Sequence, residues 1–509
     1  MNKAVPKYTI PGRDYFTTKI MPDIYERVQN KVKILAKSAN NMSLTTDIWK
    51  SKHSEESFIS LTGHILSTDF EHHTVVLRSQ HFPDCHTALN ITTMINKALI
   101  MYEIPKHKIH FICSDNAANM TSSLNTIGVT HLPCFLHTLQ LVINKSIFEQ
   151  PGVNSLLIKC KTIVTYYKKS PEAKEKYRNI QIDLGMDQHK LIQDIAIRWN
   201  STFNMLVRMV QDKDALVLFL SNATKLDVTI RADEWTKMAN LVQILGKFNE
   251  ITNILSYRQA NSSEILGNVE GLKLYMEQNW MSNFVNLRQT VNEIKAQMKQ
   301  YFQRFEDNTA LICATFLDPR YKLRWWQKKP SDSQYNIESI TDLLFEAYST
   351  HGHLCPRNEI DAVSAPAPNE VRTEEEGVNM FDGFSNRGAL GEQSFNEFLT
   401  SQFPQSQPIR QTQVTEKQLI TNEVSRYLEI PENEKLNPYV WWRSNKALYP
   451  KLAILANKFL CSPPSSVESE RLFSIGGNII TAKRNRLKPE NGEMLMSLAH
   501  NLKHLGFEY

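Results

Sequence analysis

Hydrophobic and polar residues alternate in three short segments near the start of the chain. The segments are MSLTTDIW, SFISLTGHIL and HTVVLRSQHF, and all three are rich in β-branched and aromatic residues. An alternation with a period of two is typical of a strand that turns one face to a core. Because the segments follow one another closely, we predict an antiparallel meander of three strands.

The pattern then changes to helical periodicity, interrupted by further apolar runs. TALNITTMINKALIMYEI has helical spacing, KIHFIC is a short continuous apolar run, and a second helix is expected near Asn116. The next stretch, HLPCFLHTLQLVINKSIF, is a short apolar entry followed by an amphipathic helix. Short apolar runs between polar segments are typical of buried strands. The resulting order of elements predicts an α/β domain with a mixed sheet.

Changes in composition divide the chain into five predicted regions. Residues 1–38 form a helical lead-in, and residues 39–155 form the first part of the α/β core. Helical patterns dominate residues 156–354, which we interpret as a long helical insertion. Residues 355–412 are rich in Pro, Ser, Gln and Glu, which predicts a disordered linker. Residues 413–509 return to helical patterns, so the predicted fold class is α/β plus all-α.

Two aspartates stand where predicted strands give way to polar residues. Asp47 lies near the end of the first strand, and Asp115 directly follows KIHFICS. An Asp at a strand end often serves as a helix cap or a turn former, and this alternative stays open. In a ribonuclease-H-like sheet the first and fourth strands are neighbours, so the two carboxylates would lie close together. Such hard oxygen ligands suit a pair of divalent cations ~3.5–4 Å apart in phosphoryl chemistry.

A third carboxylate is available in the late stretch SVESERLFS. This stretch offers Glu468 and Glu470, and Ser465 and Ser466 are candidate helix caps just before them. Two residues along a helix correspond to about 200° of rotation, so the two glutamates cannot face the same site. A solvated helix face is the ordinary explanation for either one.

Composition and charge narrow the class of protein. The 509 residues are 41% apolar and 22% charged, which is ordinary for a globular protein. The net charge of +5 favours a polyanionic partner only weakly, because a local basic patch matters more. The seven cysteines include no C-x-x-C, so we expect a reducing intracellular compartment. The first residues lack a signal-peptide core, and no apolar run approaches the ~18 residues of a membrane span.

Six blocks of the sequence together resemble the successive blocks of a known superfamily. The blocks are SLTTDIW, SDNAANM, CFLHTLQLV, IRWNSTFNML, FLDPRYK and YPKLAILANKFLCSPPSSVESERLFSIGG. In this order they resemble the hAT superfamily of DNA transposases, and most of all the zinc finger BED domain-containing proteins. The resemblance implies a ribonuclease-H-like catalytic core interrupted by a helical insertion, with C-terminal helices that dimerise. It also implies DNA as a partner and the nucleus as the location.

The resemblance assigns roles to individual residues. Asp47, Asp115 and Glu470 match the family's DDE acids, because the family's Glu immediately precedes the Arg of the S-E-R block. They would hold Mg²⁺ or Mn²⁺ for hydrolysis and transesterification of DNA phosphodiesters. Cys134 and His137 match the family's C-x-x-H. One Cys and one His do not close a structural zinc site, so a buried thiol and a hydrogen-bonded His remain an equal alternative.

Three further residues are candidates for contact with DNA. Arg198 and Trp199 match the family's R-W pair, whose Trp stacks on a base displaced from the duplex. A core Trp is the alternative. Trp49 lies two residues beyond Asp47 and therefore on the same strand face, where it either lines the site or packs.

The stretch TAKRNRLKPE supplies a cluster of basic residues after the third acid. Lys483, Arg484 and Arg486 are dense enough to contact DNA phosphates, although a solvated basic turn also explains them. Apolar stripes on the neighbouring helices resemble the family's dimerisation region. These stripes consist of Leu448, Leu452, Leu455 and Phe459 on one helix and Leu495, Leu498 and Leu502 on another.

The chain departs from the family in one respect. A BED zinc finger needs C-x-x-C followed by two spaced His residues, and no such finger is found. Site-specific DNA reading is therefore not expected from this sequence. The retained acids favour metal-dependent cleavage and transfer of DNA strands. The alternative is a domesticated, non-catalytic chromatin or transcription-regulatory protein that acts through dimerisation.

Overall fold

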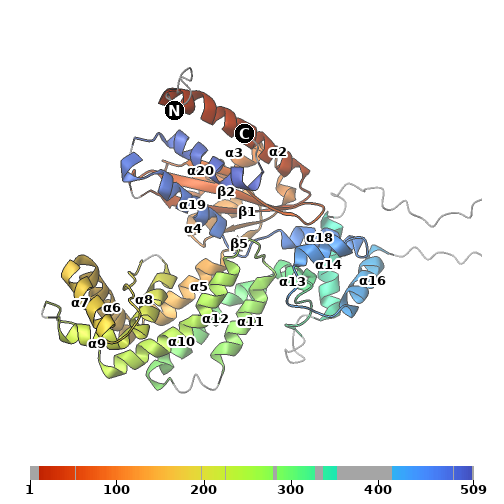
Figure 1. Ribbon diagram of the computed structural model, residues 1–509. Helices are drawn as coiled ribbons and strands as arrows, with labels where there is room; N and C mark the ends of the chain where they lie inside the picture. Colours follow the sequence, from red (N-terminus) through yellow and green to blue (C-terminus); the bar gives the residue numbers. More distant parts are fainter. Residues whose placement is uncertain are drawn as a thin grey trace, which may run out of the picture.

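The computed structural model shows a mixed sheet flanked by helices, with a largely helical part beside it (Figure 1). The predicted linker, residues 355–412, lies outside the residues that the structure describes. The described residues are 11–51, 53–195, 198–223, 225–278, 284–326, 336–351, 415–484 and 486–506.

Five strands form the sheet, in the order β3-β2-β1-β4-β5. β1 pairs antiparallel with β2, and β2 with β3, whereas β4 runs parallel to β1 and β5 parallel to β4. This arrangement confirms the predicted meander and the mixed sheet, and it places the first and fourth strands side by side. The bounds are β1 Met42–Lys50, β2 Ser57–Leu66, β3 His72–His81, β4 Ile109–Ser114 and β5 His131–Pro133.

β1 runs further than predicted. We expected it to end near Asp47, but it continues to Lys50 because β2 still pairs with it through Trp49 opposite Phe58. The parallel pairing with β4 ends earlier, at Thr45 opposite Cys113. Beyond that point only β2 hydrogen-bonds to β1, and the side of β1 next to β4 is open.

Helices cover both faces of the sheet. Leu44 and Ile112 face a core that includes apolar side chains of α2, α3 and α4. Side chains alternate along a strand, so Thr45 and Asp47 face the opposite side. There the Oγ atoms of Thr45 and Ser469 of α19 lie 3.3 Å apart. The helices and short helical turns around the sheet are α1 Arg13–Tyr15, η1 Phe16–Ile20, α2 Met21–Ser38, α3 Ala88–Met101, η2 Lys106–Lys108, α4 Ala118–Ile127, α5 Phe135–Ile143, α19 Val467–Ile479, η8 Ala482–Arg484 and α20 Pro489–His504.

α20 covers the free edge of the sheet at β3. The side-chain amide of Asn501 donates to the Val76 carbonyl at 2.9 Å and accepts from the Val76 N–H at 2.8 Å. An unpaired edge strand invites pairing with another chain. Asn501 therefore supplies the backbone partners that a sixth strand would otherwise provide.

The helical part lies between β5 and α19 along the chain, and no strand occurs among the described residues of 156–354. It shares a core with the sheet: the Phe135 ring of α5 lies 5.4 Å from both the Phe302 and Phe305 rings of α12. Its elements are η3 Asn144–Phe148, α6 Pro151–Lys169, α7 Pro171–Asp183, α8 Trp199–Gln211, α9 Lys213–Ser221, α10 Ala232–Leu255, α11 Glu264–Met276, η5 Val285–Leu287, α12 Arg288–Glu306, α13 Thr309–Leu317 and α14 Ile337–His351.

The C-terminal helices bury most of the predicted apolar stripes inside the chain itself. Leu452 and Phe459 lie in the shared core, and Leu498 lies in the core beneath the sheet, so these positions are not free surface. Leu448 and Val440 stay exposed, each at 56%. Helical periodicity alone does not say which neighbour covers a face. The helices before α19 are α16 Glu416–Glu429, α17 Pro438–Asn445 and α18 Pro450–Leu460.

Candidate active site

Asp47 and Asp115 lie next to each other at the open side of β1. Thr45 pairs with Cys113 in the parallel register, and each aspartate lies two residues further along its strand direction. Two residues restore the same face of a strand, so both carboxylates start from the face that α19 covers. The expectation that the strands leading to these two acids are neighbours is confirmed, and the shared site of the acids stays a prediction.

Both aspartates are partly buried, and each accepts a backbone hydrogen bond. The carboxylate of Asp47 accepts a hydrogen bond from the Ile48 N–H at 2.8 Å, and that of Asp115 accepts from the Ala117 N–H at 3.3 Å. Burial raises the pKa of Asp47 to about 7, and the negative charges of Asp115 and Glu470 add to this rise. The carboxylates of Asp115 and Glu470 are near enough to Asp47 to repel its negative charge, so the three acids lie in one region of the molecule.

The two glutamates of α19 point to different groups, as the helical spacing predicted. Glu468 is buried and lies 3.6 Å from Arg258 and 3.7 Å from His500, and it also pairs with Arg471. Burial opposes ionisation of Glu468, but these neighbours outweigh it and lower its pKa to about 2. Glu468 is therefore part of an internal ion network, and Glu470 is the glutamate whose charge reaches Asp47.

The side chain of Glu470 forms an ion pair with Arg198 from the helical part. Its carboxylate lies 3.8 Å from the Arg198 guanidinium, and both side chains are about half exposed. Partial burial raises the pKa of Glu470, while Arg198 and His137 act in the opposite direction. Among the described residues no three His, Cys, Asp or Glu side chains are arranged to hold a metal ion.

The side chains of Cys134 and His137 make different contacts and do not form a common site. The Cys134 thiol is buried and accepts from the His137 N–H at 3.5 Å and from the Ser466 N–H at 3.4 Å. The thiol thus caps α5 and ties it to the segment that enters α19, which agrees with the buried-thiol alternative. The His137 ring, in contrast, is partly exposed and acts on the charge of Glu470.

The two tryptophans predicted to contact DNA both pack against other side chains. Trp199 is only 4% exposed and lies in the shared core, near Phe203 of its own helix. Trp49 stacks on Phe473 of α19 with ring centroids 5.6 Å apart. The packing of α19 is tight here as well, because a Cβ on Gly476 of this helix would lie 2.6 Å from the sulfur of Met496 on α20. Contact with a nucleic-acid base stays a prediction for both tryptophans.

The basic turn lies away from the acids. Lys483, Arg484 and Arg486 are exposed and follow the C-terminal end of α19. Glu470 lies in the first turn of that helix, so at a rise of 1.5 Å per residue the two are separated by about 15 Å. Contact of the turn with phosphates near the acids therefore needs DNA that extends beyond the site.

Two residues of the site carried no signal in the sequence. Arg304 of α12 donates to the Asn116 side chain at 3.2 Å and to the Thr138 hydroxyl at 2.7 Å, next to Asp115 and His137. The Nε2 atom of His131 lies 2.9 Å from the Ser114 hydroxyl, and burial lowers the pKa of this imidazole. Arg304 is 188 residues away from Asn116 in the chain, so no local motif could have placed it there.

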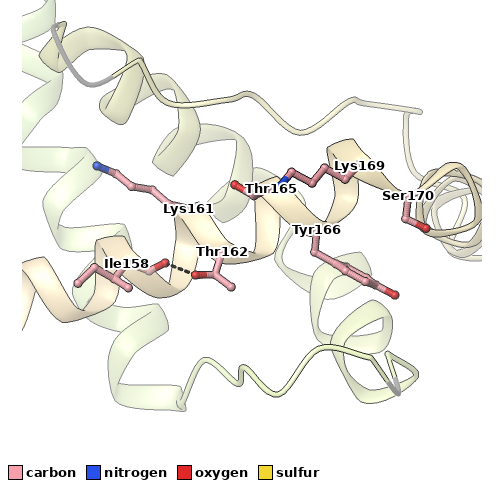
Figure 2. Close-up of a pocket in the computed structure, with 7 residues that line it drawn as sticks. All are labelled: Ile158, Lys161, Thr162, Thr165, Tyr166, Lys169 and Ser170. Carbon is pink, nitrogen blue, oxygen red and sulfur yellow. Dashed lines mark hydrogen bonds between the residues drawn. The ribbon is translucent and has the colours of Figure 1, made fainter.

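A hollow of about 540 Å³ beside α6 is separate from these acids. Figure 2 shows Lys161, Thr165, Tyr166 and Lys169 projecting from this one helix, with a hydrogen bond from the Thr162 hydroxyl to the Ile158 carbonyl. Lys161 is paired with Asp194 at 2.8 Å. Among the described residues that line the hollow there is no Asp, Glu, His or Cys, so it offers none of these metal ligands.

Three family models match the chain, and each falls on a distinct part of the structure. The ZBED1 RNase-like domain matches residues 45–132, which contain the sheet, and the ZBED1 RNase-like helical domain matches residues 132–244. The hAT family C-terminal dimerisation region matches residues 419–502. Together with the relatives below, these matches show a hAT-like protein of the BED domain-containing type.

Relatives carry names of two kinds. The chain is 26% identical to zinc finger BED domain-containing protein 4 of Homo sapiens over 99% of its length, and 26% identical to an AC transposase of Zea mays over 96%. It is 23% identical to transcriptional regulator tpeD of Talaromyces stipitatus over 93%. These alignments cover 41%, 60% and 55% of the relatives, so the chain spans about half the length of the curated relatives it matches.

The matched dimerisation region points to a chain that forms oligomers. No helix in the described ranges is long and apolar enough to cross a membrane.

Proposed function

We propose that this chain is a hAT-type transposase-like nuclear protein that dimerises, binds DNA, and cleaves and transfers DNA strands with a divalent cation. In this proposal its sheet is a ribonuclease-H-like core, and residues 156–354 are an insertion in that core. The observation that carries the proposal is the placement of Asp47 and Asp115 on one face of the sheet, with the first turn of α19 packed against it.

The donor set fits a hard cation. Asp47, Asp115 and Glu470 offer carboxylate oxygens, which Mg²⁺ and Mn²⁺ prefer. The pKa of Asp47 is raised first by burial, and the negative charges of Asp115 and Glu470 raise it further, so a cation at this site would favour the ionised carboxylate. When bound, Mg²⁺ or Mn²⁺ would activate an attacking hydroxyl and stabilise the leaving oxygen of a phosphodiester.

The protein's own side chains would position the DNA. Arg198 and Arg304 are cations near the acids: Arg198 contacts Glu470, and Arg304 contacts Asn116, the residue after Asp115. One guanidinium group can donate two parallel hydrogen bonds to the oxygens of a phosphate. Both arginines are therefore suited to hold the scissile phosphate. The backbone hydrogen bonds to Asp47 and Asp115 keep the carboxylates fixed while the phosphate enters.

A second function is also supported by a specific observation. Glu470 contacts Arg198, and no group of three ligands among the described residues is arranged to hold a metal. A relative is named a transcriptional regulator. The second candidate is therefore a domesticated, non-catalytic chromatin or transcription-regulatory protein that acts through dimerisation.

Nicking of a supplied DNA end with Mg²⁺ or Mn²⁺ separates the two functions. Catalysis requires that nicking depends on the metal and is lost in Asp47→Asn, Asp115→Asn and Glu470→Gln. Asp233→Asn, at an exposed carboxylate of α10, is the matched control and should nick like wild type. Thermal stabilisation by the metal without any nicking favours the non-catalytic function. Full activity in all three acid variants would show that the triad is wrong.

A further inference from the structure

A basic cavity of about 610 Å³ lies in the helical part, between the end of α6, α7 and the segment after α7. Four cationic side chains line it: Lys168, Lys174, Arg178 and Lys190. All four residues are exposed. The cavity is distinct from the hollow of Figure 2, which opens beside α6 at Tyr166 and Lys169.

The four cations of the cavity have no acidic partner. Within the described part of the chain, none of them lies within 4.0 Å of a carboxylate, and Arg178 has only the neutral Gln188 amide, at 2.9 Å. Other lysines of the same two helices are paired, Lys161 with Asp194 and Lys176 with Glu172, each at 2.8 Å. Lys174 and Arg178 stand four residues apart on α7, where like charges destabilise a helix. An anion in the cavity would remove this repulsion.

A carboxylate beneath the cavity, Asp212, already has hydrogen-bond partners of its own. Asp212 is fully buried and accepts from the Tyr177 hydroxyl at 2.8 Å and from the Gln181 amide at 3.2 Å, and its other oxygen lies 3.0 Å from the His189 ring. These contacts fix the floor of the cavity and the segment that carries Lys190. The cations are therefore held by a rigid base and are not spread on a loose surface.

The segment after α7 links the cavity to the acids. It runs from the cavity wall at Lys190 to Arg198, which contacts Glu470. Eight residues cover at most about 29 Å when fully extended, so the cavity and the acids are no further apart than that plus the reach of two side chains. At 3.4 Å per base pair, this span is roughly one turn of duplex DNA.

We propose that the basic cavity binds backbone phosphates of DNA whose neighbouring stretch occupies the acid site. The ligand chemistry is that of phosphodiesters, read by charge and without regard to base sequence. This inference rests on the proposed function, because it takes the acids as the place where the DNA is held. It adds an anchoring surface that lies within about one helical turn of them.

The test measures how binding of a fluorescent duplex of arbitrary sequence depends on salt. The variant Lys174→Ala/Arg178→Ala is compared with Lys176→Ala/Lys247→Ala, which removes the same charge from exposed, paired positions. Each lost phosphate contact should reduce the slope of log K against log salt by about 0.9. We expect a loss of one to two such contacts in the cavity variant and none in the control, at unchanged melting temperature. Equal slopes in the two variants would overturn the inference.

Two further arms keep this result separate from the proposed function. Asp115→Asn should abolish nicking but keep the salt slope of the wild type. If the wild type does not nick DNA but its salt slope still depends on the cavity residues, the proposed catalysis is refuted and the cavity inference stands. Vesicles with anionic lipid and single-stranded RNA are offered to the same variants. If either is bound through the cavity while duplex DNA is not, the ligand is wrong and the inference falls.

Discussion

Glu468 and Glu470 stand two residues apart on α19, and exchanging each for Gln should have opposite consequences. Glu468 is buried among Arg258, Arg471 and His500, and these partners hold its pKa at about 2, against 4.5 for the free side chain. A shift of one pKa unit is worth about 1.4 kcal/mol, so the ionised carboxylate contributes at most about 3.5 kcal/mol at neutral pH. Glu468→Gln forfeits this contribution and leaves two guanidinium groups without their buried partner.

Glu470→Gln should leave the fold intact. The Glu470–Arg198 pair is about half exposed at 3.8 Å, and such pairs contribute less than about 1 kcal/mol. Burial also raises the pKa of Glu470, so a neutral amide is no worse than the carboxylate in this position. We expect an unchanged melting temperature, together with loss of the stabilisation by Mg²⁺ or Mn²⁺ and loss of nicking.

The assay is thermal unfolding followed by circular dichroism, with and without the metal. We expect Glu468→Gln to lower the transition that includes the sheet by roughly 5–10 °C. The pKa of Glu468 is depressed in the folded state, so its stabilisation is full above pH about 4.5 and is lost as the pH falls toward about 2. The difference in melting temperature between the wild type and Glu468→Gln should therefore become smaller as the pH falls over that range. If Glu470→Gln unfolds the protein and Glu468→Gln leaves it unchanged, our orientation of α19 is wrong.

Three other outcomes are expected. Mg²⁺ or Mn²⁺ should raise the melting temperature of the wild type, because a cation relieves the repulsion at Asp47, and Asp47→Asn should blunt this rise; an equal rise in both would contradict the site. Arg304→Ala should reduce nicking at least tenfold with no change in melting temperature, whereas Arg288→Ala, on the same helix but away from the acids, should not; equal activities would refute a role for Arg304. Leu448→Asp/Val440→Asp should convert an oligomer to a monomer in light scattering, because both side chains are exposed in the matched dimerisation region; an unchanged mass would place the interface elsewhere.

The sheet and its two aspartates could be predicted from the sequence because they depend on local pattern and on topology. Alternation identified β1, β2 and β3, and the position of KIHFIC after one helix placed β4 next to β1. The end of β1 was misplaced because its pairing with β2 outlasts its pairing with β4, and a single strand's sequence does not show which neighbour ends first. The separation of Glu468 from Glu470 followed from helix geometry alone.

Contacts between distant segments could not be predicted in the same way. The burial of Trp199 depends on how α8 packs into the shared core, and a motif match gives no information about that packing. Arg304 reaches Asn116 only because α12 packs against α5. The four cations of the basic cavity look like ordinary solvated lysines and arginines in the sequence. Only the fold shows that they converge and that their helix neighbours, but not they, have acidic partners.

The helical part controls the charge around the acids through Arg198. In the structure the guanidinium of Arg198 is the cation nearest to Glu470 in any described ion pair, at 3.8 Å and half exposed. A contact of this kind is weak and is screened by salt, so a divalent cation competes with it easily. If Glu470 held a divalent cation as proposed, the Arg198 guanidinium would be free to bind a phosphate beside the site. Arg198 and Lys190 are only eight residues apart in the chain. The cation that contacts Glu470 and a cation of the basic cavity therefore belong to neighbouring positions of the sequence.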